Sequence, residues 1–242
     1  EMLGIAMDDV LVRLGDTDFP RGPGSGGSWG AASIGSAAYL ACRALRKMLA
    51  EKAGTDESDL VLRDGAVEGG RSLVELLDGK EVSEEGHYEP GDIADSHTAS
   101  GFGAFFAQVR VNRFTGETRV DRMLGAFGFG RVLNEKTARS QCLGGITWSI
   151  GAALTEALHF DPNDGHLVNC DLAEYHVPVN RDVGEVEVLM VEERDPVASP
   201  IQAKGIGELG MCGGAGAIAN AIYNACGARV LSFPMTPDRV LE

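Results

Sequence analysis

The segment over residues 203–227 constrains this 242-residue chain more than any other part of its sequence. It holds one carboxylate, Glu208, among glycines and apolar residues, and a run of small residues continues from there as far as Cys226 and Gly227. Such a run predicts a closely packed helix, and a glycine directly after the last apolar turn commonly terminates one. We therefore expect a glycine-rich loop that presents Glu208 and leads into a helix that ends at Cys226.

The surroundings of Glu208 predict that its side chain is desolvated. Desolvation disfavours the charged form of a carboxyl group and moves a buried glutamate toward the neutral range in which a general base works best. The neighbouring glycines allow a ligand to approach the backbone closely, and the following helix N-terminus directs N–H groups at an anionic or oxo group. The segment thus predicts an acidic catalyst, with an exposed glutamate in an ordinary turn as the alternative.

Gly205, Gly207 and Gly210 also match the G-x-G-x-x-G pattern of a dinucleotide-binding loop. That pattern requires a buried strand before it and an acidic residue about 20 positions after it. Pro196 and Pro200 precede the loop here, and prolines are excluded from a central strand. No acidic residue stands at the later position. We therefore do not expect a nicotinamide-dependent dehydrogenase.

A second glycine-rich loop, over residues 22–33, opens directly onto a helix expected from about residue 34 to residue 52. Backbone N–H groups and serines at a helix N-terminus suit phosphate or another anion. A flexible linker is the alternative, but Trp29 and the strong helix directly after it argue against disorder. We predict an anion-binding loop at this position.

The second half of the chain carries the clearest secondary-structure signals. Residues 103–112 and 117–124 alternate apolar and polar positions on either side of a short turn, which predicts a β-hairpin with one solvated face. Residues 183–191 alternate in the same way and predict another strand. Mixed helices and hairpins without a βαβ repeat predict an α+β fold, with mixed sheets and packed helices.

Asn134 predicts the N-cap of a helix that continues to about residue 157. Gly144, Gly145 and Gly151 lie inside this helix. Each costs roughly 1 kcal/mol relative to alanine, so we expect the helix to pack closely against another backbone or a ligand.

Weaker signals predict several short elements. These are the end of an amphipathic helix at residues 1–5, strands at 10–15, 60–63 and 65–68, a short helix at 72–77, and a hairpin-like pair at 158–160 and 167–170. A helix end at the first residues leads us to expect a fragment, or one piece of a longer assembly.

Composition limits the classes of partner and metal site. The formal net charge of −15 argues against nucleic acid or an anionic membrane as a partner. The sequence has no apolar run of membrane-spanning length and no recognisable signal peptide, so we expect a cytoplasmic protein. The five cysteines and five histidines form no C-x-x-C or HExxH pattern, so we expect no metal site in this chain and buried, free thiols.

Three motifs, taken in order, resemble a known family. They are the Gly-Ser-Gly-Gly-Ser-Trp-Gly segment at residues 24–30, residues 134–141 with Gly144 and Gly145, and the Lys-Gly-x-Gly-Glu segment at 204–208. Together they resemble the C-terminal part of the molybdenum-binding subunit of the xanthine dehydrogenase/aldehyde oxidase family, over essentially the whole chain. The form of the first motif and residues 229–237 are most similar to the bacterial aldehyde-dehydrogenase-like branch.

The resemblance implies a fold of the molybdenum-cofactor-binding-domain type, with sub-lobes at about 1–98 and 99–242 and the N-terminal half of the subunit absent. It implies oxidation of an aldehyde or an N-heterocycle, with water as the oxygen source. In that family the glutamate at the Glu208 position is the general base that deprotonates a molybdenum-bound hydroxide. Hydride passes to a sulfido ligand, and electrons leave through [2Fe–2S] clusters to FAD on partner subunits.

The resemblance also implies which residues hold the pterin cofactor, expected in its cytosine dinucleotide form. Gln141 would hydrogen-bond the pterin, and Lys204 and Gly205 would lie at the cofactor. The phosphate or dinucleotide would be held by Gly26, Gly27, Ser28, Trp29, Gly30 and Ala31. We expect the isolated chain to be inactive and to bind no cofactor, because the missing half supplies the other contacts. The alternative is a non-catalytic scaffold or assembly domain in which Glu208 is structural.

Overall fold

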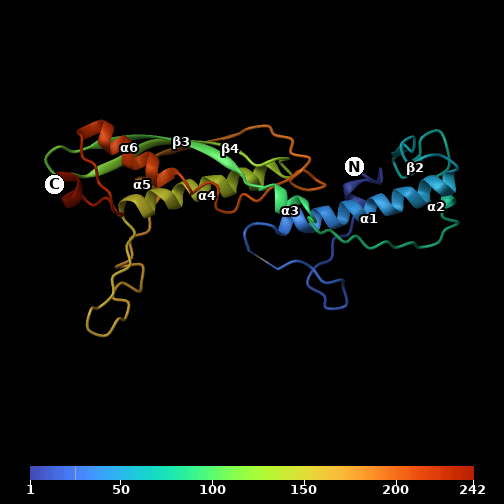
Figure 1. Cartoon of the computed structure of the whole chain (residues 1–242), viewed down its shortest axis with the longest axis horizontal. Coiled ribbons are helices and arrows are strands. Elements are labelled where there is room, and N and C mark those ends of the chain that lie inside the picture. The colour runs from blue at the N-terminus through green and yellow to red at the C-terminus, as the bar shows by residue number, and fades with distance from the viewer. Residues whose placement is uncertain (25) are drawn as a thin grey trace. The chain divides into compact units, whose positions relative to one another are not determined.

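The computed structural model describes residues 1–24 and 26–242, so that Ser25 of the first glycine-rich loop lies outside the described residues. The chain divides into two compact units, which we describe separately. Unit 1 comprises Glu1–Thr98 and Asp195–Gln202, and unit 2 comprises Ala99–Arg194 and Ala203–Glu242. Figure 1 shows the helices and strands of both units.

Unit 1 is built on the long helix α1 (Gly30–Ala53), which ends where Gly54 adopts a left-handed conformation. The predicted helix is confirmed, although it begins four residues earlier than expected. The short pieces expected at residues 60–77 are also present, as β1 (Leu62–Arg63), β2 (Ala66–Val67) and α2 (Leu73–Leu76). Unit 1 further contains a 3-10 turn, η1 (Met7–Asp9), and the short helix α3 (Ile93–Ser96).

Two expectations for the N-terminal residues are wrong. Residues 1–6 form no helix, and residues 10–15 form no strand. Val10, Leu11 and Leu14 are exposed instead. A strand needs a neighbour that takes up its backbone hydrogen bonds, and within the described residues no strand pairs with this segment.

Unit 2 contains a three-stranded sheet in the order β3-β4-β5. The predicted hairpin is present as β3 (Phe102–Val111) and β4 (Thr118–Gly128), which are antiparallel. The predicted third strand is present as β5 (Glu185–Met190), which runs parallel to β4. The sheet is therefore mixed, and the α+β prediction is confirmed.

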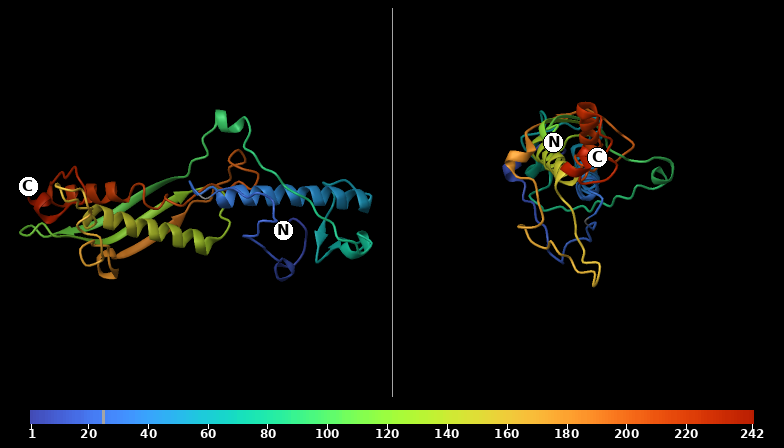
Figure 2. Two further views of the ribbon diagram at one scale, coloured as in Figure 1. Left: turned by 90° about the horizontal axis from the view of Figure 1, so that it is seen from below. Right: turned by 90° about the vertical axis from the view of Figure 1, so that its left-hand side faces the viewer.

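Two helices pack on one face of this sheet, as Figures 1 and 2 show. They are α4 (Glu135–Leu154) and α6 (Gly214–Cys226), and the shorter helices α5 (Asn180–Val183) and α7 (Pro237–Leu241) complete the unit. The Asn134 side chain caps α4 by accepting a hydrogen bond from the Thr137 N–H, and Gly227 ends α6, both as predicted. Their apolar faces meet the sheet in one core, made by Met123, Phe127, Val188, Ile146, Ile150, Ile218 and Ile222.

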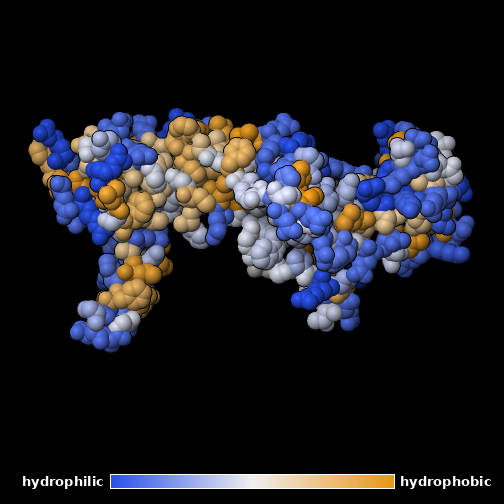
Figure 3. Space-filling view, viewed as in Figure 1, coloured by the Kyte–Doolittle hydropathy of each residue, from blue (hydrophilic) through white to orange (hydrophobic). Residues whose placement is uncertain are grey.

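The opposite face of the sheet carries exposed apolar side chains. Phe102, Phe106 and Leu189 are 56%, 59% and 48% exposed, and Figure 3 shows apolar residues gathered over β3 and β4. The register pairs Ala104 with Ala126 and Ala126 with Leu189, so these side chains occupy neighbouring positions. We call this surface, made by Phe102, Ala104, Phe106, Ala126 and Leu189, the outer sheet face.

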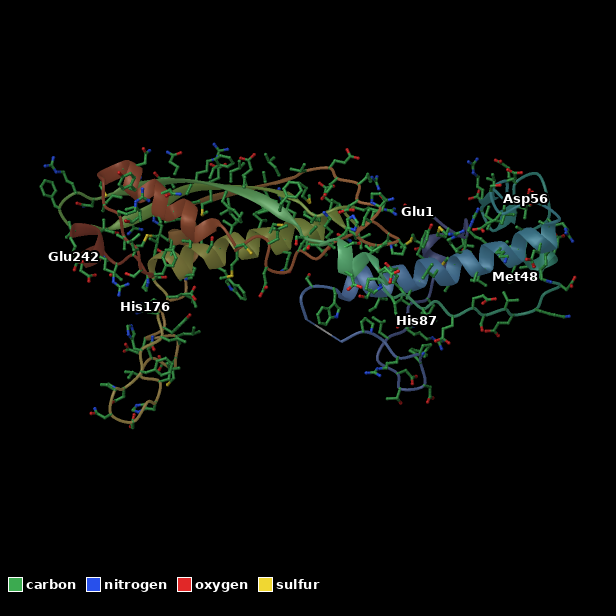
Figure 4. The ribbon with its side chains drawn as sticks, in the orientation of Figure 1. Glu1, Met48, Asp56, His87, His176 and Glu242 are labelled. Atoms are coloured by element: carbon green, nitrogen blue, oxygen red, sulfur yellow. The ribbon has the colours of Figure 1, made fainter. Side chains whose placement is uncertain are left out.

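A long loop joins α4 to α5. The hairpin-like pair expected within it is reduced to a single bridge between Phe160 and Leu167. The loop returns to the end of α4 at His176, whose carbonyl oxygen accepts a hydrogen bond of 2.8 Å from the Thr155 hydroxyl (Figure 4). Among the described residues, no helix has the length and apolar character needed to cross a membrane.

Candidate functional site

A cavity of about 460 Å³ in unit 2 lies between α4 and the loop that carries Glu208. On α4 the lining positions recur every three or four residues, so one face of the helix forms one wall. The Glu208 loop forms the other wall. The lining residues are Thr137, Ser140, Gln141, Gly144, Gly145 and Trp148 of α4, with Gly207, Glu208 and Met211 of the loop.

Glu208 lines this cavity with an exposed side chain. The expected desolvation of Glu208 is therefore wrong for the residues of this chain. The reason lies in its apolar neighbours, because Ile206 and Leu209 turn toward the core and pack against it. Glu208 stands between them and projects away from the core. The loop thus presents a carboxylate to the cavity and leaves it open to whatever occupies the space.

Gln141 connects the two walls of the cavity. Its side-chain Nε2 donates a hydrogen bond of 2.8 Å to the carbonyl oxygen of Gly207, which lies 66 positions away in the sequence. Two residues that the sequence analysis singled out independently, Gln141 and Glu208, are thereby brought to one site. The amide oxygen of Gln141 remains able to accept a hydrogen bond from a ligand.

The glycines inside α4 differ in their surroundings. A Cβ atom on Gly145 would lie 2.7 Å from the carbonyl carbon of Gly210, and one on Gly210 would lie 2.6 Å from the carbonyl oxygen of Cys142. A Cβ atom on Gly151 would lie 2.7 Å from Cδ of Pro178, whereas Gly144 has no neighbour within 4 Å. The prediction of close packing against another backbone is confirmed for Gly145, whereas Gly151 packs against the side chains of Glu156 and Pro178 and Gly144 leaves open space beside the cavity.

Lys204 is directed away from the cavity. Its side chain is 5% exposed, and Nζ lies 2.8 Å from Oε1 of Glu193 and 3.3 Å from the carbonyl oxygen of Ser100. The ammonium group therefore neutralises a carboxylate within unit 2. The Lys204 side chain does not line the cavity, and its expected place at the cofactor stays a prediction. The backbone of Lys204 and Gly205 leads on to Glu208.

The predicted anion-binding loop belongs to unit 1 and is described apart from the cavity. The Trp29 indole Nε1 donates a hydrogen bond of 2.7 Å to the Gly24 carbonyl oxygen. Its ring lies over the two glycines of the loop, so that Cβ atoms on Gly26 and Gly27 would lie 3.2 and 3.1 Å from ring carbons. Gly27 and Ser28 have φ values of +48° and +60°. Trp29 thus holds the loop in a compact turn.

The helix that follows this loop suits an anion. The side chain of the N-cap residue Trp29 makes no capping hydrogen bond to α1, and the first turn of the helix contains no acidic residue. The first N–H groups of a helix have no intrahelical partner and carry a partial positive charge. Gly30 and Ala31 add little bulk at this end. The residues present are therefore compatible with a phosphate group, as the sequence analysis predicted.

Sequence reasoning missed several residues of the cavity. Trp148 and Met211 line it, as do Thr137 and Ser140. The spacing of residues 137, 140, 144 and 148 along one helix face was a usable signal, since Gln141 already marked that face. Glu193 carries no recognisable motif, and its link to Lys204 follows only from the fold.

The histidines and cysteines are arranged differently from the expectation. Asp161, Asp164 and His166 place ligand atoms within 4.8 Å of one another. Hydrogen bonds inside an exposed turn account for this arrangement, since Asp164 bonds the His166 ring and Asp161 bonds Asn163. All five cysteines are free, but only Cys142 is buried, while Cys170, Cys212 and Cys226 are exposed. The expectation of generally buried thiols is therefore wrong.

Comparisons with known proteins show the family to which the chain belongs. The family model of the molybdopterin cofactor-binding domain matches residues 1–184. The chain is 44% identical, over 100% of its length, to the aldehyde oxidoreductase molybdenum-binding subunit PaoC of Escherichia coli K12, of which it covers 34%. It is 32% identical to the probable hypoxanthine oxidase XdhD of the same organism, again over 100% of the chain and 26% of the relative.

A solved structure shows the same fold. Quinoline 2-oxidoreductase from Pseudomonas putida 86 superposes with a TM-score of 0.81 at 25% identity, covering 99% of this chain and 33% of that chain. The sequence in hand thus spans about a third of the length of the relatives and structures that it matches.

Proposed function

The chain belongs to the molybdopterin cofactor-binding domain family, and on this premise we propose that it forms the C-terminal part of the molybdenum-binding subunit of a molybdenum hydroxylase. The proposed reaction is the oxidation of an aldehyde or an N-heterocycle, with water as the oxygen source. The 44% identity to the aldehyde oxidoreductase subunit PaoC supports the bacterial aldehyde branch. Because the chain spans only a third of that relative, the activity belongs to the complete subunit.

The proposal assigns the role of general base to Glu208. The observation that carries it is the position of this carboxylate in the cavity, between the Gln141–Gly207 hydrogen bond and the Gly145–Gly210 contact. A general base must be held within hydrogen-bond reach of the proton that it removes. Both contacts fix the backbone beside Glu208, so that its Oε atoms can receive a proton from a group bound in the cavity.

When bound, the molybdenum cofactor would supply the two-electron oxidation. The residues of this chain would hold it at two places. The loop formed by Gly26, Gly27, Ser28, Trp29, Gly30 and Ala31 would bind its phosphate or dinucleotide through backbone N–H groups. The Gln141 amide oxygen would accept a hydrogen bond from the pterin. Trp148 and Met211, which line the same cavity, would contact the group bound next to Glu208.

The remainder of the subunit is the first partner in this proposal. The outer sheet face supports it, since Phe102, Phe106 and Leu189 expose contiguous apolar surface of the kind that marks an interface. In this proposal the remainder of the subunit covers the outer sheet face. It also covers the open side of the cavity and so desolvates Glu208. We further propose an iron–sulfur subunit and an FAD subunit as electron acceptors, in a cytoplasmic assembly. The free cysteines are consistent with a reducing compartment.

The test is the molybdenum content of the chain co-expressed with the protein encoded immediately upstream, measured by mass spectrometry on the purified complex. We expect about one metal per complex. Gly27→Val should abolish binding, because a β-branched residue at φ +48° is strained and its Cβ would press on the Trp29 ring. Gly22→Ala is the matched control, since Gly22 lies in the same loop with no neighbour within 4 Å. An intact complex without metal would instead support the scaffold role.

A further inference from the structure

Glu193 joins two segments that meet beside the Glu208 loop. Its Oε1 lies 2.8 Å from Nζ of Lys204, and its Oε2 accepts a hydrogen bond of 2.7 Å from the backbone N–H of Gly130. Gly130 stands two residues after the end of β4, and Lys204 stands four residues before Glu208. One carboxylate therefore links the end of a core strand to the start of the catalytic loop.

The backbone makes the same connection in parallel. The Lys204 N–H donates a hydrogen bond of 3.0 Å to the Phe129 carbonyl oxygen, and Ala203 forms an antiparallel bridge with Gly130. Ala203 is 4% exposed. Residues 203 and 204 are thus fixed to the sheet by backbone bonds and by the ion pair together. Glu208 lies between this anchor and the Gly145–Gly210 contact, and the Gln141–Gly207 hydrogen bond holds the residue just before it.

We propose that Glu193 is a positioning residue for Glu208, an inference that rests on the proposed function. The Lys204 side chain is 5% exposed, so its charge is stabilised by Glu193 and not by water. Without that carboxylate, the buried ammonium loses the counter-charge that Glu193 supplies, so its burial becomes more costly. The ion pair then no longer supports the backbone bonds of residues 203 and 204, so this anchor of the Glu208 loop is weakened, while the Gln141–Gly207 hydrogen bond and the Gly145–Gly210 contact remain.

The glycine content of residues 204–210 explains why the Glu208 loop needs an anchor. Gly205 and Gly207 stand on either side of Ile206, and glycine leaves a backbone with more freedom than any other residue. A loop of this composition does not hold a side chain in place by itself. A catalytic group must be kept within a fraction of an ångström of its productive position. Because the glycines leave the backbone free, the contacts that anchor the loop must supply this restraint.

A first experiment uses hydrogen exchange in the 242-residue chain. The Leu209 and Met211 N–H groups bond to the carbonyl oxygens of Ile206 and Glu208. In Glu193→Gln, whose amide oxygen can still accept from Gly130, we expect these two amides to exchange at least ten times faster. Glu187→Gln is the matched control, because it breaks an ion pair with Arg122 on the sheet, away from the loop. Equal exchange in parent and Glu193→Gln would overturn the proposal.

A second experiment uses the assembled enzyme. We expect Glu193→Gln to lower kcat at least tenfold, with KM changed less than threefold and molybdenum content unchanged. In a Glu208→Gln background the same change should lower the remaining turnover by less than twofold, because it acts through Glu208. A full additional loss in that background would show a merely structural role and overturn the proposal. Unimpaired turnover of Glu208→Gln alone would reject the role of Glu208 as general base. The hydrogen-exchange result would still decide whether Glu193 positions the Glu208 loop.

A further variant covers the case in which Glu193→Gln does not fold. The Glu193→Gln/Lys204→Met variant contains no buried charge at this place and keeps the length of the lysine stem. It should show the same faster exchange at Leu209 and Met211. Parental exchange rates in this folded double variant would contradict the positioning role.

Discussion

The backbone of Gly145 lies directly against the backbone of Gly210. A Cβ atom on Gly145 would lie 2.7 Å from the carbonyl carbon and 2.8 Å from the Cα atom of Gly210. No side chain separates α4 from the Glu208 loop at this point. The contact sets the distance between the helix face that carries Gln141 and the loop that carries Glu208, and it therefore defines the cavity between them.

Gly145→Ala should destabilise unit 2. The new methyl group meets backbone atoms, which cannot rotate away, so we expect a loss of about 1–3 kcal/mol in the free energy of unfolding. Gly144→Ala, one position earlier with no neighbour within 4 Å, should gain about 0.5–1 kcal/mol from helix propensity. Urea unfolding of the two variants measures both effects. Equal changes in the two variants would show that this contact is absent.

Elements with strong local signals could be predicted from the sequence. The Asn134 cap and the Gly227 terminator mark the ends of α4 and α6, and strict alternation marks β3 and β4. The segment over residues 10–15 has a similar apolar content, but it finds no partner strand among the described residues and remains exposed. An apolar run predicts a strand only where a neighbour is available, and the sequence does not contain that information.

The candidate site could be predicted in part. The motifs indicated Glu208 and Gln141, and the fold joins them through a bond that spans 66 positions. The surroundings of Glu208 were misjudged, because its apolar neighbours pack toward the core and leave it exposed. Glu193 could not be found, because a single acid in a polar segment has no pattern and its partners, Gly130 and Lys204, are brought to it only by the fold.

The cysteines should differ sharply in their reactivity. Cys142 is fully buried on α4, and burial raises the pKa of its thiol, so little thiolate forms. Cys170, Cys212 and Cys226 are exposed. We expect N-ethylmaleimide at neutral pH to modify these three in the folded chain and to modify Cys142 only after denaturation. Peptide mass spectrometry locates the label, and rapid modification of Cys142 in the folded chain would contradict the packing of α4.

An ion pair on the sheet should make stability depend on pH. Arg110 binds Asp121 through two hydrogen bonds, of 2.8 Å from Nε and 2.7 Å from Nη2, and these bonds lower the pKa of Asp121 below its ordinary value of 3.8. A lowered pKa in the folded state contributes stability above pH 3.8 that is lost as the pH falls through the lowered value. Arg110→Gln should therefore be less stable than the parent at neutral pH, and the difference should shrink in acid.

The control for this prediction is the Asp121→Asn background, which removes the titrating group. There the effect of Arg110→Gln should not change with pH. Chemical unfolding at a series of pH values provides the measurement. A pH-dependent difference that persists in the Asp121→Asn background would assign the effect to another group.

The outer sheet face should matter for association and not for the stability of the chain alone. Phe106 is 59% exposed, so Phe106→Ser should change the free energy of unfolding of the chain by less than about 0.5 kcal/mol. Binding to the remainder of the subunit should weaken by about 2 kcal/mol, as expected for an aromatic anchor. Leu231→Ser, at a residue that is 90% exposed elsewhere in unit 2, is the control. Unchanged binding of Phe106→Ser would exclude this face as the contact surface.

Glu208→Gln in the assembled enzyme tests whether Glu208 is the general base. Glutamine keeps the size of the side chain but cannot receive the proton. We expect turnover to fall about 10²–10⁴-fold, as for the loss of a general base, with one molybdenum per complex retained. Turnover at the parental rate, in a complex with full metal content, would exclude Glu208 as the general base.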